Sequence, residues 1–488
     1  MWSSFIKTRV NPSYFYLLLG FAFLFFSNGR WILPAAAFAS PIFLIRFLRF
    51  QKPFKGFVFL IIAGWVSNIF IWKGMMPASG FFYYFLMLMM SVFTSLTFVI
   101  DRIFSRRLKG IVSTFVFPSI YVTMEYIVVS TNPSGSYGTL AHTQSSLPLL
   151  QLVSLTGIWG VTFVITWTAS VVNWLWDHAF AKKILRQAFW AYALPVLVVI
   201  IFGQIRLSIP VESKTIRVAS INIRKTYWEN RFKANNDSIT QEINNDFLGN
   251  CDIAASSQAR IVFGTEELIN LPFDRETAFV ERAKAIAQKD SIYLGLPMCI
   301  FPNGYPRVPS INKITWISPG GQLLFTYCKA KPTPGEGSYG DGVIRYFDSP
   351  YGRIGSAICF DMDFPALIRQ VHTMNIDMML VPGNDWKEIA PYHTYVASIR
   401  ALEQGFNLVR AVSQGFSASF NYKGQVISSQ DFYRTNDLIL YSDVPMKGGP
   451  TVYSVVGDLF AWLCIIGFLI IIVSSLFQRK ADMTSTKE

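Results

Sequence analysis

Three segments of the sequence place reactive side chains at the ends of short apolar runs. Glu266 follows the run ARIVFGT, Lys329 lies in FTYCKAKPTPGEG, and Cys359 stands near the end of GRIGSAICF. Loops held at strand ends by a rigid scaffold are where functional side chains concentrate. A cysteine acts as a nucleophile only beside a base or a cation, because its free thiol, with a pKa of about 8.5, is mostly protonated at neutral pH. Glutamate and lysine are residue types that supply these two groups.

Each segment taken alone is explained by an ordinary surface or core position. A glutamate after a strand is usually solvated, as are two lysines such as Lys329 and Lys331 on an extended segment. A lone cysteine at a strand end is more often part of the core than a nucleophile. The five cysteines show neither CxxC nor zinc spacing, so the sequence predicts no metal site and no disulfide framework. Only the combination of the three segments carries a functional hypothesis.

In the order Glu, Lys, Cys, the segments resemble the nitrilase (carbon–nitrogen hydrolase) superfamily. The patterns of that superfamily are roughly PE, YxK…GE and C(Y/W)(D/E), and here they read TE, YCK…GE and CFD. The resemblance implies that Glu266 is the base, that Lys329 holds the oxyanion, and that Cys359 carries an acyl group as a thioester. The same order disfavours a papain-like arrangement of cysteine and histidine.

The resemblance also implies three supporting residues, and it contains departures. Glu336 is expected to be a second carboxylate of the site, and Phe360 and Asp361, directly after the nucleophile, are expected to support it. Thr265 replaces the usual proline, the segment from Lys329 to Glu336 is one residue short, and the Phe–Asp pair replaces Tyr–Glu. These departures leave open an altered substrate.

The composition indicates a membrane protein. Apolar residues make up 52% of the 488 residues and charged residues only 15%, and the mean hydropathy is +0.35. The net charge of +13 is explained by basic residues that cap apolar stretches, so we expect no nucleic-acid partner. Stretches long enough to span a bilayer lie at 11–28, 31–48, 55–75, 81–101, 111–130, 150–176, 189–208 and 453–477.

The distribution of basic residues predicts the topology. One set of alternate loops holds most of the lysines and arginines near the spans, whereas the loops between them hold only Arg30 and Lys73. Because basic residues accumulate on the cytoplasmic side, both termini are expected there. Seven predicted spans precede residue 210. We therefore expect a membrane bundle at 1–209, an extracytoplasmic domain at 210–450, and a last span with a cytoplasmic tail at 451–488.

The segment 210–450 has the pattern of an α/β domain, with short β-rich runs alternating with polar helical stretches. Strands are predicted at 215–223, 259–265, 291–297, 313–319, 352–360, 377–383, 407–413 and 416–422, and helices at 236–247, 274–289, 364–374 and 393–404. Together with the resemblance, this predicts a multi-pass α-helical membrane bundle plus an extracytoplasmic α/β nitrilase-type domain, an αββα sandwich.

One branch of the superfamily carries membrane spans on both sides of the catalytic domain, the apolipoprotein N-acyltransferases. The stretches GTLAHTQSSLPLLQLVSLTGIWG and NDWKEIAPYHTYVASIRALEQGFNLVRAVSQG resemble that family. The resemblance implies a multi-pass protein of the bacterial inner membrane that needs neither cofactor nor metal. It implies transfer of an acyl chain from a phospholipid to the amine of a diacylglyceryl lipoprotein.

Two further residues are assigned to substrate access. Glu125 lies within the fifth predicted span, where an ionisable side chain either has a structural partner or lies near a lipid-binding site. Trp228 lies in the 225–250 segment, which together with 131–149 is expected to cover the site. A membrane-tethered amidase that uses water as the acceptor remains an alternative, favoured by Thr265 and Asp361. A non-catalytic scaffold is disfavoured because the three reactive residues occur together.

Overall fold

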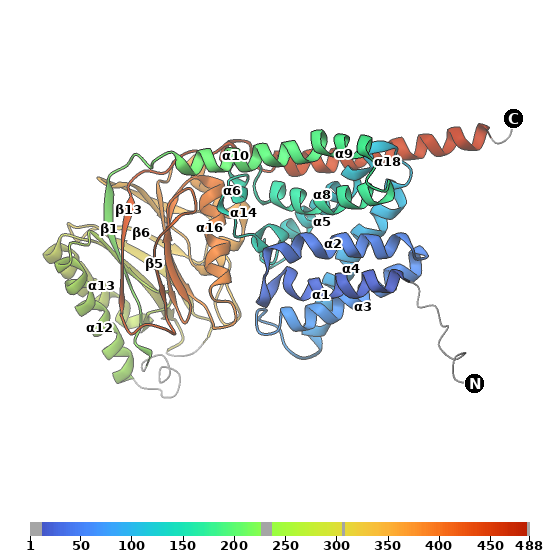
Figure 1. Ribbon diagram of the computed structural model, residues 1–488. Coiled ribbons are helices and arrows are strands. Elements are labelled where there is room, and N and C mark those ends of the chain that lie inside the picture. Colours follow the sequence, from blue (N-terminus) through green and yellow to red (C-terminus); the bar gives the residue numbers. More distant parts are fainter. Residues whose placement is uncertain (1–11, 226–236, 305–307, 486–488) are drawn as a thin grey trace. The chain divides into compact units, whose positions relative to one another are not determined.

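The computed structural model describes residues 12–225, 237–304 and 308–485. The chain divides into two compact units (Figure 1). The helical unit comprises Met1–Pro133, Gly138–Ile205 and Asp458–Glu488, and the sheet unit comprises Ser134–Tyr137 and Arg206–Gly457.

The helical unit consists of apolar helices joined by short loops. Its α-helices are α1 (Ser13–Ser27), α2 (Pro34–Arg49), α3 (Pro53–Ile71), α4 (Gly80–Ser105), α5 (Val116–Thr131), α6 (Leu147–Leu150), α7 (Val153–Thr156), α8 (Ile158–Asp177), α9 (Lys182–Ala188), α10 (Leu194–Ser208, which runs into the sheet unit) and α18 (Leu459–Ser485). Large apolar side chains such as Leu18 and Phe81 are 65% and 85% exposed. Helices with apolar side chains on their outer surface are suited to lipid.

Five helices of the described residues are long and apolar enough to cross a membrane: Pro53–Ile71, Gly80–Ser105, Gly110–Thr131, Ile158–Asp177 and Lys182–Ser208. The predicted spans 11–28, 31–48 and 453–477 overlap α1, α2 and α18, and of these Ser13–Ser27 and the Leu459–Ser475 part of α18 are shorter apolar helices.

Two of the predicted spans are interrupted by glycine. The 150–176 stretch is divided at Gly157, and the 453–477 stretch is divided at Gly457 between α17 (Val452–Val456) and α18. Both glycines have positive φ, +65° and +60°, a conformation that ends a right-handed helix.

The sheet unit contains two β-sheets. The first has the order β13-β1-β2-β4-β5-β6, with β3 paired to β4, and the second has the order β12-β11-β10-β9-β8-β7. The strands of the first sheet are β1 (Thr215–Ile221), β2 (Ile261–Gly264), β3 (Ile269–Pro272), β4 (Tyr293–Phe301), β5 (Ile311–Ile317), β6 (Leu323–Cys328) and β13 (Ile439–Pro445). Those of the second are β7 (Arg345–Ser349), β8 (Gly352–Ser356), β9 (Met378–Asn384), β10 (Asn407–Ser413), β11 (Phe416–Phe420) and β12 (Val426–Asp431).

The sheets pack face to face because alternate residues of each strand are apolar on the inner side. Val218, Phe263 and Trp316 of the first sheet share one buried cluster with Leu380 and Leu408 of the second. Helices α12 (Asp237–Ser256) and α13 (Glu276–Asp290) cover the outer face of the first sheet, and α16 (Tyr392–Gln404) lies on the other side of the sandwich (Figure 1). Short helices α14 (Pro365–Ile368) and α15 (Gln370–Thr373) precede β9. The predicted α/β sandwich is confirmed.

Candidate active site

Glu266 lies directly beyond β2, between the ends of strands from both sheets. The N–H of Thr265 donates to the carbonyl of Ile221 at 3.0 Å, and the N–H of Glu266 donates to the carbonyl of Gly383 at 3.3 Å. The Glu266 side chain is only 3% exposed. Its neighbour Glu267 has a φ of +53°, so the chain turns sharply after Glu266. The carboxylate of Glu266 is therefore held inside the sandwich by backbone on both sides.

Lys329 follows β6 and forms the centre of a buried ion cluster. Its Nζ donates to Oε1 of Glu266 at 2.9 Å and to Oε1 of Glu336 at 3.0 Å. The Nδ2 of Asn312 donates to the same two oxygens, at 2.8 Å and 2.6 Å. Burial lowers the pKa of Lys329, but the charges of Glu266, Cys359 and Glu336 raise it more, and its pKa lies well above the usual value. The ammonium is therefore charged.

Cys359 begins the 3₁₀ turn η6 (Cys359–Asp363) with a φ of +47°. A left-handed conformation is unfavourable for a residue with a Cβ atom and persists where the surrounding structure holds it, often at functional sites. Burial raises the pKa of the Cys359 thiol well above its usual value, and the charge of Glu266 raises it further, whereas Arg410 and Lys329 lower it. The resting group is a thiol that needs a base.

Asp361 connects the turn that begins at Cys359 to the segment that carries Lys329. Its carboxylate accepts hydrogen bonds from Tyr327 Oη at 2.8 Å, from the N–H of Ile358 at 2.9 Å and from the N–H of Lys331 at 2.8 Å. Burial raises the pKa of Asp361 to about 6, against the effect of these bonds. Phe360 packs edge to face on Phe364, with ring centroids 5.2 Å apart.

A second polar cluster lies against Cys359. Asp385 Oδ1 is 2.7 Å from His393 Nδ1 and 3.1 Å from Arg410 Nη2, and His393 Nε2 is 2.8 Å from Asp363 Oδ2. Burial and Arg410 lower the pKa of His393, but Asp385 and Asp363 raise it more, to about 9. The imidazole is therefore protonated at neutral pH and donates to both carboxylates.

Three atoms suitable for a metal lie within 4.8 Å of one another in this cluster, on Cys359, Asp385 and His393. However, Arg410 Nη2 lies 2.9 Å from His393 Nδ1 and 3.1 Å from Asp385 Oδ1. A guanidinium therefore already occupies the position from which a cation would balance the carboxylate.

The sequence singled out neither Asn312 nor the cluster of Asp385, His393 and Arg410 as site residues. The last three lie in the NDWKEIAPYHTYVASIRALEQGFNLVRAVSQG stretch, so its resemblance to the family was a signal that could have found them. Asn312 lies within β5, and the sequence contains no comparable signal for it. It belongs to the site because the N–H of Lys329 donates to the backbone carbonyl of Asn312 at 2.9 Å, a contact that only the folded chain forms.

The structure describes one of the two residues assigned to substrate access. Glu125 in α5 accepts hydrogen bonds from the N–H of Leu140 and from Thr162 Oγ1, both at 2.7 Å, so it has structural partners within the helical unit. Trp228 lies outside the described residues. In the 131–149 segment, the N–H of Ser136 donates to the carbonyl of Asp363 at 2.7 Å, and the Tyr137 ring packs edge-on to His393.

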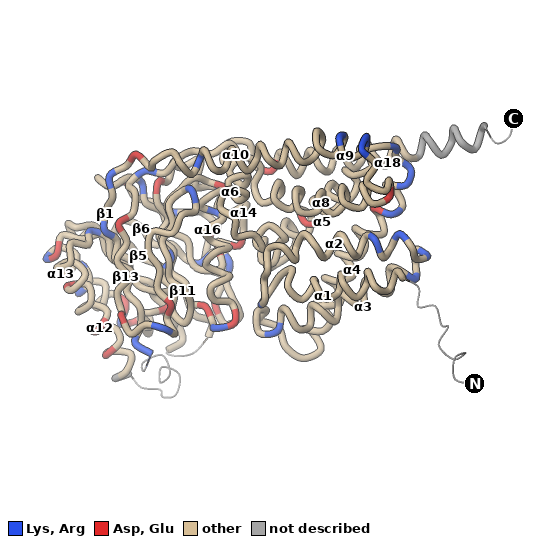
Figure 2. Tube along the Cα trace, in the orientation of Figure 1, with Lys and Arg blue, Asp and Glu red and all other residues tan. Residues whose placement is uncertain are grey.

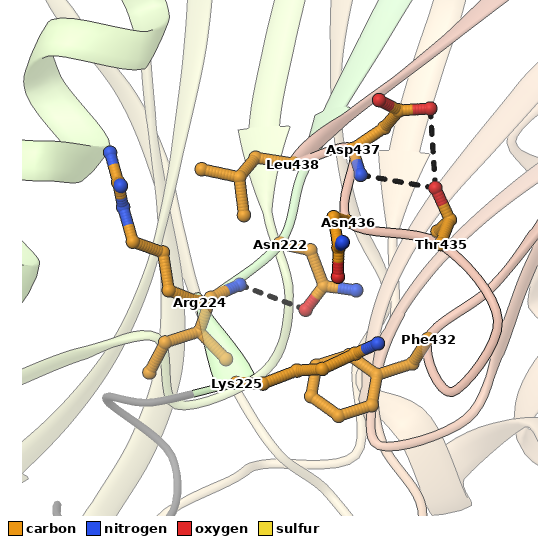
Figure 3. Close-up of a pocket in the computed structure, with 9 residues that line it drawn as sticks. Asn222, Arg224, Lys225, Phe432, Thr435, Asn436, Asp437 and Leu438 are labelled. Atoms are coloured by element: carbon orange, nitrogen blue, oxygen red, sulfur yellow. Dashed lines mark hydrogen bonds between the residues drawn. The ribbon is translucent and has the colours of Figure 1, made fainter.

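A cavity of about 230 Å³ lies where the chain leaves β1 and approaches β13 (Figure 3). None of the three reactive residues lines it. Its lining consists of Asn222, Ile223, Arg224, Lys225, Phe432, Thr435, Asn436, Asp437 and Leu438.

Comparison with known proteins agrees with both units. The family models for Carbon-nitrogen hydrolase and for the Apolipoprotein N-acyltransferase N-terminal domain match residues 217–448 and 17–171. The Apolipoprotein N-acyltransferase of Geobacter metallireducens is 25% identical over 408 residues, which cover 76% of each chain. The chain is a divergent member of the apolipoprotein N-acyltransferase family. The Apolipoprotein N-acyltransferase 2 of Treponema denticola is 23% identical over 424 residues, covering 76% of this chain and 78% of that relative.

Among solved structures, an amidase from Nesterenkonia sp. is similar to this acyltransferase, with 17% identity and a TM-score of 0.41. The similarity covers 49% of this chain and 93% of the amidase. The family predicted from the sequence, and its acyltransferase class, are confirmed by the family models and the curated relatives.

Proposed function

We propose that this acyltransferase moves an acyl chain from a membrane phospholipid, through a thioester on Cys359, to the α-amine of a diacylglyceryl-cysteine lipoprotein. The observation that carries the proposal is the burial of Glu266 and Lys329 as an ion pair 2.9 Å long whose charges act on the thiol of Cys359. The match of the helical unit to an acyltransferase-specific domain supports a lipid substrate over a soluble amide.

In the first half-reaction, the proton of Cys359 Sγ passes to the carboxylate of Glu266 as the sulfur attacks the ester carbonyl carbon. The carbonyl oxygen becomes an oxyanion, which the Lys329 ammonium and a backbone N–H beyond Cys359 stabilise. When the tetrahedral intermediate collapses, the carbon–oxygen bond of the ester breaks. The leaving alkoxide of the lysophospholipid takes the proton from Glu266, and the acyl group remains on sulfur.

In the second half-reaction, the amine of the lipoprotein attacks the thioester carbonyl and gives its proton to Glu266. The carbon–sulfur bond then breaks, and the proton returns to Cys359, so the enzyme is restored. Lys329 stays charged throughout because its pKa lies well above the usual value. Water is a competing acceptor, and the amidase alternative differs only in this step.

The transfer is tested with the full-length enzyme, a phospholipid labelled in its sn-1 acyl chain, and a synthetic diacylglyceryl lipopeptide. The label is expected in the lipopeptide as an amide, and omission of the lipopeptide should leave it on the protein. Mass spectrometry of the lipopeptide and of the protein measures both. Label released only as free fatty acid, with or without the lipopeptide, would instead establish a hydrolase.

We also propose that the sheet unit is extracytoplasmic and that both termini are cytoplasmic. The lysines and arginines of the helical unit gather at one end of its helices, around 46–55, 102–109 and 182–186 (Figure 2). The loops at the other end contain only Arg30 and Lys73. This asymmetry is typical of cytoplasmic loops at the basic end.

The orientation is tested by thiol labelling in intact cells with a reagent that does not cross the membrane. A cysteine introduced at Ser238 should react, whereas a cysteine at Ser105, the last residue of α4 within the basic 102–109 segment, should react only after the cells are opened. The unmodified chain measures the background from its own cysteines. Protection of Ser238→Cys together with labelling of Ser105→Cys would reverse the topology.

A further inference from the structure

Cys359 has polar neighbours that the Glu–Lys–Cys mechanism does not use. Its Sγ lies 4.0 Å from Arg410 Nη2, 4.0 Å from Asp385 Oδ1 and 4.0 Å from the carbonyl of Asn384. A contact of this length is within reach of a hydrogen bond to the large sulfur atom. Arg410 is therefore a cation that directly contacts the nucleophilic atom.

Arg410 is fixed in β10, an interior strand of the second sheet, and its side chain is fully buried. Its guanidinium lies against strand β9, where a Cβ atom added at Gly383 would be in van der Waals contact with Nη2, at 3.4 Å. Within the described part of the chain, Nε and Nη1 have no hydrogen-bond partner. A buried guanidinium with unpaired N–H groups is unfavourable for stability. The nitrogen that has partners is Nη2, which faces Asp385 Oδ1 and Cys359 Sγ.

The two clusters differ in net charge, and this difference decides which of them better stabilises a thiolate. Lys329 is shared by the carboxylates of Glu266 and Glu336, so that group carries one negative charge in excess. Arg410 and protonated His393 face the carboxylates of Asp385 and Asp363, which gives two positive and two negative charges. A negative charge on sulfur is therefore better accommodated on the Arg410 side.

We propose that Arg410 is a further catalytic residue, which stabilises the thiolate of Cys359 through Nη2–H, and that Asp385 and His393 are positioning residues that hold the guanidinium. When the Sγ proton passes to Glu266, the negative charge appears 4.0 Å from Arg410. When the carbon–sulfur bond of the thioester later breaks, the electron pair returns to sulfur at the same place. The inference rests on the proposed function only for the assignment of Cys359 as the nucleophile.

The charged groups that face the thiol come from four elements. They are Glu266 after β2, Lys329 after β6, Asp385 after β9 and Arg410 on β10. Burial and Glu266 raise the pKa of Cys359, and Arg410 lowers it more than Lys329 does. Loss of Arg410 should therefore raise the pH at which the thiol ionises.

Alkylation of Cys359 by iodoacetamide tests the proposal without any acyl substrate. The rate is measured over a range of pH on the full-length protein in detergent, by mass spectrometry of the peptide that contains Cys359. In Arg410→Gln the profile should move to higher pH by about 1 to 3 units, which makes alkylation at neutral pH at least about tenfold slower. Arg410→Lys keeps the charge and should recover part of the wild-type profile.

Arg400 provides a matched control, because it is another fully buried arginine, paired with Glu403 at 2.8 Å. Arg400→Gln should lower the melting temperature in the same way as Arg410→Gln but leave the alkylation profile of Cys359 unchanged. An unchanged profile in Arg410→Gln, or an equal displacement in Arg400→Gln, would overturn the proposal. The outcome is independent of the acyl donor, so failure of the phospholipid assay with a displaced profile would count only against the proposed function.

Discussion

Replacing Cys359 with alanine is expected to abolish acyl-enzyme formation, a loss of at least about 10⁴-fold in rate, because no other group can carry the acyl chain. Cys359→Ser should be nearly as defective. An alcohol is far less acidic than a thiol, and the Glu266 carboxylate cannot generate the alkoxide efficiently. The measurement is covalent labelling of the protein by a phospholipid with a labelled acyl chain.

Cys328 provides the control for this experiment. It directly precedes Lys329 at the end of β6, and its pKa is raised, first of all by burial, without the support of the catalytic cluster. Cys328→Ala should therefore be labelled by the phospholipid as the unmodified chain is. Labelling of Cys359→Ala together with loss of labelling in Cys328→Ala would mean that the nucleophile had been assigned to the wrong cysteine.

The predicted strands and the missed strands occupy different places within the sheets. The eight predicted strands are all present, and most are interior strands with continuous apolar runs. Four of the missed strands, β6, β7, β12 and β13, are the edges of the two sheets. An edge strand is partly exposed and carries polar side chains, as in the half-exposed VISSQD of β12. Apolar patterning therefore does not detect it.

The sequence predicted only those site residues that lie in recognisable local motifs. The order of Glu266, Lys329 and Cys359 pointed to one superfamily, and the structure brings the first two into an ion pair. The contact of Arg410 with Cys359 joins residues 51 positions apart, and that of Asn312 with Glu266 joins residues 46 positions apart. Such contacts follow from strand order and register within the two sheets, which the sequence did not specify. The catalytic roles themselves stay predictions.

Replacing Lys329 with alanine is expected to have the second large effect, on both rate and stability. Removal of the ammonium leaves Glu266 and Glu336 buried beside each other, with the amide of Asn312 as a shared donor. One carboxylate should then bind a proton, since two buried negative charges in contact are strongly unfavourable. Loss of the oxyanion donor alone should slow acylation by about 10² to 10³-fold, and a protonated Glu266 should slow it further.

The stability of the Lys329→Ala protein should fall by about 3 to 5 kcal/mol, because breaking a buried ion cluster leaves a charge uncompensated. Adding Glu336→Gln removes one of the two carboxylates, so the double variant should regain much of this stability without regaining acylation. Thermal unfolding and phospholipid labelling measure the two quantities separately. Lys331, whose Nζ lies over the Phe364 ring at 4.6 Å, provides the control, and Lys331→Ala should change acylation little. Recovery of activity together with stability in the double variant would show that Lys329 acts through folding alone and takes no part in catalysis.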